Sequence, residues 1–138
     1  MSLTPVVTLA RTTITGIAPS RAPKTVGPYV HATVHENTVY STCILPIDPK
    51  SGQLVGDTAE ERFRRIYQNL SVVLEEAGSS PQRILKQTLY LTDLADFYAF
   101  NKLTVEFLGD HRPARATVKV LGLPLEAPCG LEVIAARN

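Results

Sequence analysis

Hydrophobic residues recur with two different periods along this chain, and the change of period separates strands from helices. From residue 57 onward the apolar positions lie three and four residues apart, as on one face of an α-helix, and they are Phe63, Ile66, Leu70, Val73, Leu74 and Ala77. Asp57 and Glu60 have the spacing of a capping box, and Gly78 follows the last apolar residue. The pattern therefore predicts a helix over about 57–77.

A second helix is predicted from about Leu94 to Leu108. Thr92 and Asp93 are both suitable caps for its start, and Gly109 follows its end. The residues at helical spacing that would face the interior are Phe97, Phe100, Thr104, Phe107 and Leu108.

The remaining apolar segments have the composition or alternation of β-strands. They are a short strand at Arg11–Ile14, two strands joined at 35–37, a strand over 83–91, one over 115–120 and a last one over 131–137. Both faces of 83–91 are apolar, which places it inside the sheet. We expect an α+β fold in which two helices cover one side of one mixed sheet. The uncovered side must be polar or buried in an oligomer, and the Val, Leu and Ile content favours the oligomer.

Length and charge limit the classes of protein to be considered. The 138 residues, 44% hydrophobic and 20% charged, fit a single domain over 1–138, with residues 1–22 expected to form a poorly ordered leader that holds a short first strand. The net charge is +1 without any basic cluster, so a nucleic-acid partner is not expected. Neither a membrane span nor a secretory signal is evident.

The compartment expected from these features is the cytoplasm. The first 35 residues contain no Asp or Glu but carry Arg11, Arg21 and Lys24, so a mitochondrial location stays open as the alternative.

The familiar signatures of cofactor and metal sites are missing from the sequence. It contains no GxGxxG, no GxxxxGK[ST] and no GxSxG motif. Its two cysteines, Cys43 and Cys129, form no CxxC pair and no Cys/His cluster. We therefore expect neither metal nor cofactor, and by itself Cys43 is interpreted as a buried hydrophobic residue.

Arg115 is the one side chain for which strand alternation suggests chemistry. In 115–120 the side chains of Arg115, Thr117 and Lys119 point to one face and the apolar ones to the other. A strand arginine is either a solvated charge or a rigidly held guanidinium that binds a carboxylate through two parallel hydrogen bonds. Thr117 could add a hydroxyl group to the same pocket.

Four segments together resemble the Rid family (YjgF-like) of reactive enamine and imine deaminases. They are VGPYV at 26–30, STCILPIDPKSGQ at 41–53, RPARATVKV at 112–120 and the closing LEVIAAR. The resemblance runs from about Pro23 to the end. It implies a chorismate-mutase-like α+β fold, a homotrimer whose sheets pack into a central barrel, and active sites in clefts between subunits.

The resemblance also implies roles for individual residues. Arg115 occupies the position of the family arginine that binds the substrate carboxylate, and Tyr29 matches the tyrosine that lines the cleft. Thr42 and Cys43 stand where the family usually has Ser-Gly. Asn101 matches an asparagine of the second helix that faces the same cleft.

Three positions depart from the family pattern. Gly130 stands where deaminating members carry a glutamate associated with water, Thr117 stands where many have cysteine, and Cys43 replaces a glycine. Glu132 lies on the same strand face as Gly130, about 7 Å along the strand.

Three hypotheses for function follow. The first is hydrolysis of a 2-imino acid to a 2-keto acid and ammonia, with Arg115 holding the carboxylate. The second is a divergent, pathway-specific enzyme that performs a cyclisation, dehydration or decarboxylation in the same cleft. The third is a non-catalytic ligand-binding or chaperone-like protein. In each case the expected partner is a small carboxylate, imine or carbonyl compound.

Overall fold

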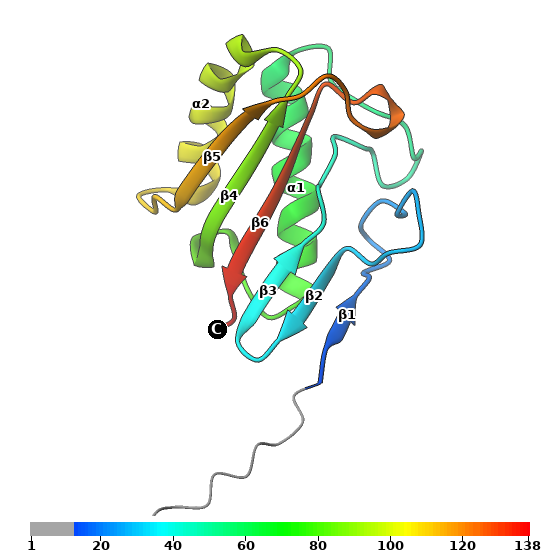
Figure 1. Ribbon diagram of the computed structural model, residues 1–138, viewed down its shortest axis with the longest axis vertical. Helices are drawn as coiled ribbons and strands as arrows, with labels where there is room; N and C mark the ends of the chain where they lie inside the picture. Colours follow the sequence, from blue (N-terminus) through cyan, green and yellow to red (C-terminus); the bar gives the residue numbers. More distant parts are fainter. Residues whose placement is uncertain (1–12) are drawn as a thin grey trace, which may run out of the picture.

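One mixed sheet forms the frame of the protein (Figure 1). The structure is a computed structural model and describes residues 13–138. Within them the strand order is β1-β2-β3-β6-β4-β5, and only β4 and β5 pair in parallel. The strands are β1 (Thr15–Ile17), β2 (Ala32–His35), β3 (Thr38–Ser41), β4 (Ile84–Leu91), β5 (Ala114–Lys119) and β6 (Cys129–Ala136).

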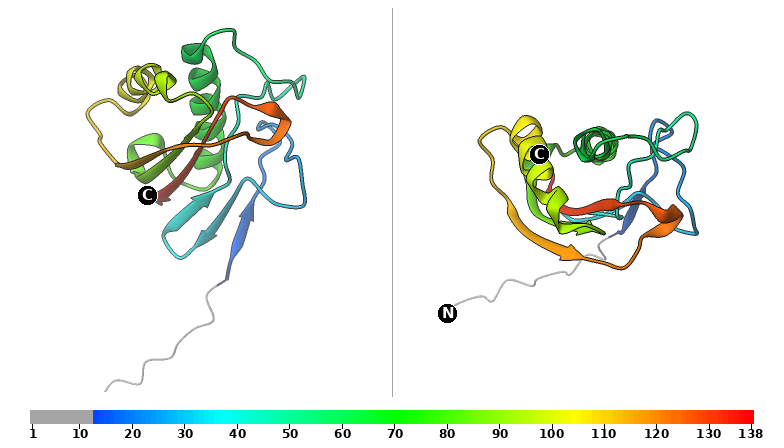
Figure 2. Two further views of the ribbon diagram at one scale, coloured as in Figure 1. Left: turned by 45° about the horizontal axis from the view of Figure 1, so that its top comes forward. Right: turned by 90° about the horizontal axis from the view of Figure 1, so that it is seen from above.

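Two α-helices pack on one face of this sheet, as Figure 2 shows from above. They are α1 (Ala59–Glu76) and α2 (Phe97–Leu108), and 3₁₀ turns lie at Pro81–Arg83, Leu94–Asp96 and Pro124–Glu126. The α+β arrangement predicted from the sequence, with both helices on one side of a mixed sheet, is confirmed. The interior position predicted for the strand at 83–91 is also confirmed, because β4 lies between β6 and β5.

The start of α1 is one residue later than the sequence pattern indicates. Thr58, not Asp57, is the N-cap: its hydroxyl accepts a hydrogen bond from the Glu61 N–H at 3.2 Å. The Glu61 carboxylate in turn accepts from the Asp57 N–H at 2.8 Å. This reciprocal pair is a capping box moved on by one position, because a threonine hydroxyl can accept the same N–H hydrogen bond as an aspartate carboxylate. The helix ends at Gly78 as expected, with φ +78°.

The second predicted helix is divided at its beginning. Its first turn, Leu94–Asp96, is 3₁₀, and the Asp93 carboxylate caps it by accepting from the Ala95 N–H at 3.0 Å. Gly109 ends α2 with φ +62°. The fully buried side chains of α2 include Leu103, which the predicted inner face omitted, whereas Phe97 and Phe107 are only partly buried.

Pairing between strands sets their limits and corrects two expectations. The first strand of the described residues lies at Thr15–Ile17, which pair with β2. Of the strand expected at Arg11–Ile14, residues 13 and 14 are outside any strand, and residues 11 and 12 are not described. Residues 1–12, which include most of the expected leader, lie outside the described part of the chain. The last strand begins at Cys129 rather than 131, because Cys129 pairs with Leu91.

Four aromatic rings fill the space between the helices and the sheet. Phe63 meets Phe100 edge to face at 5.2 Å between ring centroids, and Tyr67 stacks on both Phe100 (5.5 Å) and Phe107 (5.0 Å). The buried Tyr67 hydroxyl donates to the Gln87 side chain of β4 at 2.8 Å and also bonds the Thr104 hydroxyl at 2.9 Å. These hydrogen bonds satisfy the polar groups that the ring cluster brings into the core.

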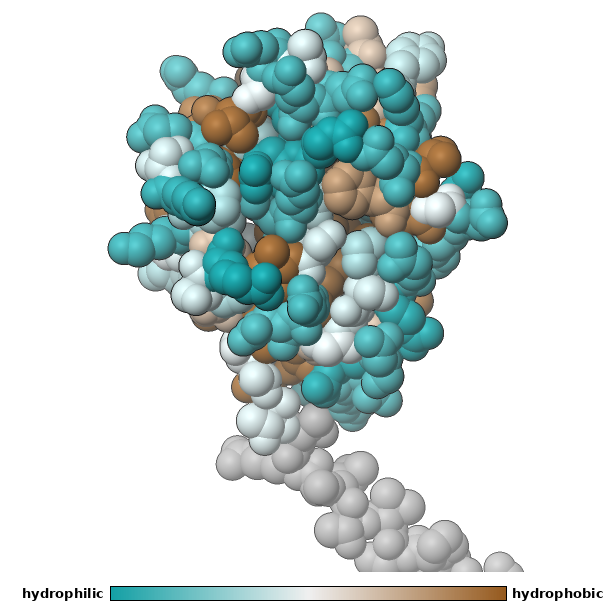
Figure 3. All heavy atoms as spheres, turned by 180° about the vertical axis from the view of Figure 1, so that it is seen from behind, coloured by the Kyte–Doolittle hydropathy of each residue, from teal (hydrophilic) through white to brown (hydrophobic). Residues whose placement is uncertain are grey.

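The two outer faces of the molecule differ in character. The outside of the helices is mostly hydrophilic, with scattered apolar residues (Figure 3). The uncovered sheet face mixes polar groups such as Thr88 and Glu132 with the exposed side chains of Tyr40 and Val118. Among residues 13–138, no helix is long and apolar enough to cross a membrane.

Candidate functional site

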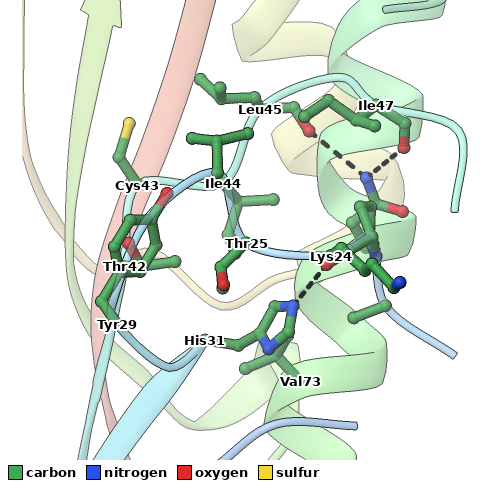
Figure 4. A pocket seen from close by; sticks show the side chains of 14 residues that line it. Lys24, Thr25, Tyr29, His31, Thr42, Cys43, Ile44, Leu45, Ile47 and Val73 are labelled. Carbon is green, nitrogen blue, oxygen red and sulfur yellow. Dashed lines mark hydrogen bonds between the residues drawn. The ribbon is translucent and has the colours of Figure 1, made fainter. Parts of the chain in front are cut away.

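Three of the predicted site residues line one small hollow that opens to solvent (Figure 4). Tyr29, Thr42 and Cys43 lie on its wall. The wall is built by the loop before β2, the segment that follows β3, and α1. Asn69 of α1 fixes the second of these segments, because its side-chain amide donates to the carbonyls of Leu45 (3.3 Å) and Ile47 (2.8 Å).

The loop before β2 presents Tyr29 at the mouth of the hollow. A Cβ on Gly27 would lie 3.0 Å from the Tyr29 ring, so glycine lets the ring pack against the loop backbone. This contact gives a physical reason for the glycine of the VGPYV segment. The Thr42 N–H donates to the His31 carbonyl at 2.8 Å, which ties this loop to the segment after β3.

His31 also lines the hollow, although it was not among the predicted site residues. Its ring is buried, and Nε2 donates to the Pro23 carbonyl at 2.5 Å. Nε2 is thus the donor nitrogen of the ring, and Nδ1 has no hydrogen-bond partner within residues 13–138. This buried nitrogen is therefore a polar atom without a partner in the described part of the chain. Its position directly after VGPYV was the only signal available.

Cys43 and Gly130 are in direct contact, although 86 residues lie between them in the sequence. Ile44 and Leu131 pair as an isolated bridge, with N–H to carbonyl distances of 2.7 and 3.0 Å, and this bridge holds their neighbours side by side. A Cβ added to Gly130 would lie only 2.5 Å from the Cys43 sulfur and 3.2 Å from a Leu45 methyl. The thiol therefore occupies the space that any side chain at position 130 would need.

The Cys43 thiol is protonated at neutral pH. Burial is the main cause that raises its pKa to about 11, and the negative charge of Glu132 adds to the effect. Burial likewise raises the pKa of Cys129 to about 12. Because the thiolate is the nucleophilic form, neither cysteine resembles an activated nucleophile. The interpretation of Cys43 as a buried apolar group is thus supported, although its side chain is not fully enclosed.

Glu132 is engaged with Tyr90 on the uncovered face of the sheet. The Tyr90 hydroxyl donates to the Glu132 carboxylate at 2.5 Å, and this hydrogen bond is the first cause that raises the pKa of Tyr90 to about 12. Gly130 and Tyr90 are direct cross-strand partners, and so are Glu132 and Thr88. Glu132 is therefore the carboxylate on this face that lies closest along β6 to Gly130.

Arg115 lies on the edge strand β5 and points toward α2. One guanidinium nitrogen, NH1, donates to the Asn101 side-chain oxygen at 2.6 Å, and the guanidinium carbon lies 5.5 Å from the centre of the Phe100 ring. Within residues 13–138, Nε and the other terminal nitrogen make no hydrogen bond. Thr117, two residues further along β5, is on the same strand face and exposed.

The predicted site residues thus form two separate groups in one chain. Tyr29, Thr42, Cys43 and Gly130 belong to the hollow and its surroundings. Arg115, Thr117 and Asn101 lie at the free edge of β5. Arg115 is the cross-strand partner of buried Gln87, whereas Gly130 pairs with half-buried Tyr90, so their side-chain directions belong to opposite faces of the sheet.

The described part of the chain holds no group of three or more His, Cys, Asp or Glu side chains arranged to bind a metal ion.

Comparison with known proteins agrees with this fold and these motifs. The sequence model of the family described as Endoribonuclease L-PSP matches residues 19–137. The chain belongs to this family. A RutC family protein of Pyrococcus abyssi is 38% identical over 118 residues, which cover 86% of this chain and 93% of the relative.

Two further relatives bear on function. The human protein named 2-iminobutanoate/2-iminopropanoate deaminase is 31% identical over 122 residues, covering 88% of this chain and 89% of its own length. The crystal structure of E. coli TdcF with bound serine superposes with a TM-score of 0.83 at 31% identity, covering 90% of this chain and 99% of TdcF. The family thus includes proteins named as deaminases of reactive intermediates.

Gly130→Ala should destabilise the protein by about 1–3 kcal/mol, because the new methyl group would overlap the Cys43 sulfur. The same substitution made in a Cys43→Gly background should lower the free energy of unfolding much less. Urea unfolding of the four members of this double-mutant cycle measures the coupling. Gly122→Ala is the matched control, since no atom lies near its Cβ position. An equal cost of Gly130→Ala in both backgrounds would show that the two positions are independent.

Alkylation of Cys43 by iodoacetamide should be slow at pH 7 and reach half its maximal rate near pH 11, because only the thiolate reacts. Glu132→Gln should move this midpoint to lower pH, since it removes a negative charge that opposes thiolate formation. Rates are followed by mass spectrometry of the Cys43 peptide, with Glu36→Gln in the distant hairpin turn as the control. A midpoint near the ordinary value of about 8.5 would contradict the assignment.

Proposed function

We propose that this protein hydrolyses a 2-imino acid to the 2-keto acid and ammonia, with Arg115 binding the substrate carboxylate. The observation that carries the proposal is the state of Arg115: NH1 is held by Asn101, while Nε and the other terminal nitrogen have no partner in residues 13–138. A guanidinium held in this way offers two parallel donors to a carboxylate. Support comes from the relatives named as deaminases and from TdcF, which was crystallised with serine, a carboxylate.

The reaction needs few groups from the protein. The oxygen of water forms a bond to the imine carbon, and one proton of that water moves to the nitrogen. The resulting carbinolamine expels ammonia as its C–N bond breaks and its hydroxyl proton passes to nitrogen, which leaves the carbonyl. Such a step is accelerated mainly by holding the imine carbon and the water oxygen close together in the reactive orientation. The hydroxyl groups of Tyr29, Thr42 and Thr117 are the candidates to orient the water.

We place the reaction in a cleft between two copies of the chain, in a homotrimer. The two groups of predicted site residues lie apart in one chain, so a neighbouring copy has to bring the Arg115 group against the Tyr29 group. The free edge of β5 and the partly apolar uncovered face, with Val118 and Tyr40 exposed, are surfaces that a second copy can cover. An interface of this kind would also complete the hollow.

One observation favours a second candidate, a divergent enzyme that performs a different step on a reactive carbonyl or imine compound. The Cys43 thiol fills the space beside Gly130, so no carboxylate can project from position 130. A cyclisation, dehydration or decarboxylation in the same cleft would not require water to be activated there.

Arg115→Ala should lower kcat/KM for a 2-imino acid by about 10- to 100-fold, the effect of losing a hydrogen-bonded charge pair. The imine is generated in the cuvette by an amino acid oxidase, and its decay is followed with and without the protein. Arg112→Ala is the matched control, because Arg112 bonds only the carbonyls of Gly109 and His111 among the described residues. If the wild type does not accelerate decay, deamination is excluded and the second candidate is favoured.

Mixing two inactive variants tests the shared cleft. Arg115→Ala and Tyr29→Ala chains, expressed together, should assemble into trimers in which some sites contain Arg115 from one copy and Tyr29 from its neighbour. Random assembly would leave about a quarter of the sites intact, and activity should recover to that level. Light scattering on the same sample gives the oligomeric mass. A monomeric mass, or no recovery in the mixture, would contradict the intersubunit site.

A further inference from the structure

A buried aromatic ring lies directly beneath the guanidinium group of Arg115. The guanidinium carbon is 5.5 Å from the centre of the Phe100 ring, within the range of a cation–π interaction. Phe100 is fully buried, whereas Arg115 is exposed on the edge strand β5. One side of the guanidinium therefore packs against the ring, and the opposite side faces solvent.

This support uses none of the hydrogen-bond donors of Arg115. The attraction acts between the positive charge and the negative face of the ring, so it holds the guanidinium against the ring without occupying an N–H group. Asn101 takes one donor through NH1. A second side-chain acceptor in place of Phe100 would take another donor, and the pair needed for a carboxylate would then be incomplete.

The Phe100 ring is itself held from two sides. Phe63 meets it edge to face at 5.2 Å, and Tyr67 stacks on it at 5.5 Å. Tyr67 is fixed by its hydrogen bonds to Gln87 and Thr104. Gln87 is also the cross-strand partner of Arg115. The backbone and the guanidinium of Arg115 are therefore both positioned by the same buried cluster.

We propose that Phe100 is a positioning residue that sets the orientation of the Arg115 guanidinium through a cation–π interaction. Its effect on substrate binding rests on the proposed function, in which Arg115 holds a carboxylate. The orientation of Arg115 itself does not depend on that function. The two parts can therefore be tested separately.

The test replaces Phe100 by phenylalanines with one, two and three ring fluorines, incorporated at that codon. Fluorine withdraws charge from the face of the ring while it changes the size and the apolar character of the ring little. The order parameter of the Arg115 Nε–H, measured by NMR relaxation, should fall stepwise with fluorine number. KM for the imine should rise by about two- to fivefold across the series with kcat nearly unchanged.

The matched control is the same fluorine series at Phe63. Phe63 belongs to the same cluster, is equally buried, and contacts the Phe100 ring, but no contact between it and Arg115 is found in residues 13–138. Its series should leave the Arg115 order parameter and KM unchanged. Thermal unfolding of every variant shows whether the core is intact.

The outcomes separate the two proposals. An order parameter that does not respond to fluorination of Phe100, or that responds equally at Phe63, overturns the role of Phe100. If the order parameter falls as expected but the wild type neither hydrolyses the imine nor binds 2-oxobutanoate, the proposed function fails while Phe100 still positions Arg115. A KM that follows the order parameter supports both.

Discussion

The burial of one sheet face beneath α1 and α2, through the cluster of four aromatic rings, is the constraint on which the rest of the structure depends. This packing fixes the position of α2 on β4 and β5, because Phe100 and Phe107 both stack on Tyr67. Asn101 follows Phe100 in α2 and therefore meets Arg115. The same one-sided packing leaves the opposite face of the sheet without a cover within residues 13–138.

The pair Cys43 and Gly130 depends on a second, more local constraint. The bridge between Ile44 and Leu131 brings the two backbones so close that the Cys43 sulfur lies where even a Cβ at position 130 would have to be. The chain places a thiol at 43 and nothing at 130. The cysteine and the glycine, two of the positions at which the resemblance implies a departure from the family pattern, thus meet in a single contact.

The sequence predicted the helices, the mixed sheet and the one-sided cover, because these follow from local periodicity. The ends were harder to predict: Asp57 and Thr58 are equally good caps, and only the Glu61 hydrogen bonds distinguish them. Strand alternation singled out Arg115 and Thr117, the other site residues came from resemblance to the family, and the roles of all of them stay predictions. What no local pattern could show were contacts between distant segments, such as Cys43 against Gly130 or the Phe100 ring under Arg115.

These contacts define the kind of catalysis that the proposed reaction can use. The Cys43 thiol, with a pKa of about 11, cannot serve as a base near neutral pH, and Glu132 already accepts a hydrogen bond from Tyr90. Proton transfer by a dedicated side chain therefore has little support beside Gly130. Catalysis would then rely on orientation of the substrate: when its carboxylate is fixed on Arg115, its imine carbon lies at a defined place. In such a site substrate binding, and with it kcat/KM, depends on how rigidly Arg115 is held, and thus on the buried ring beneath it.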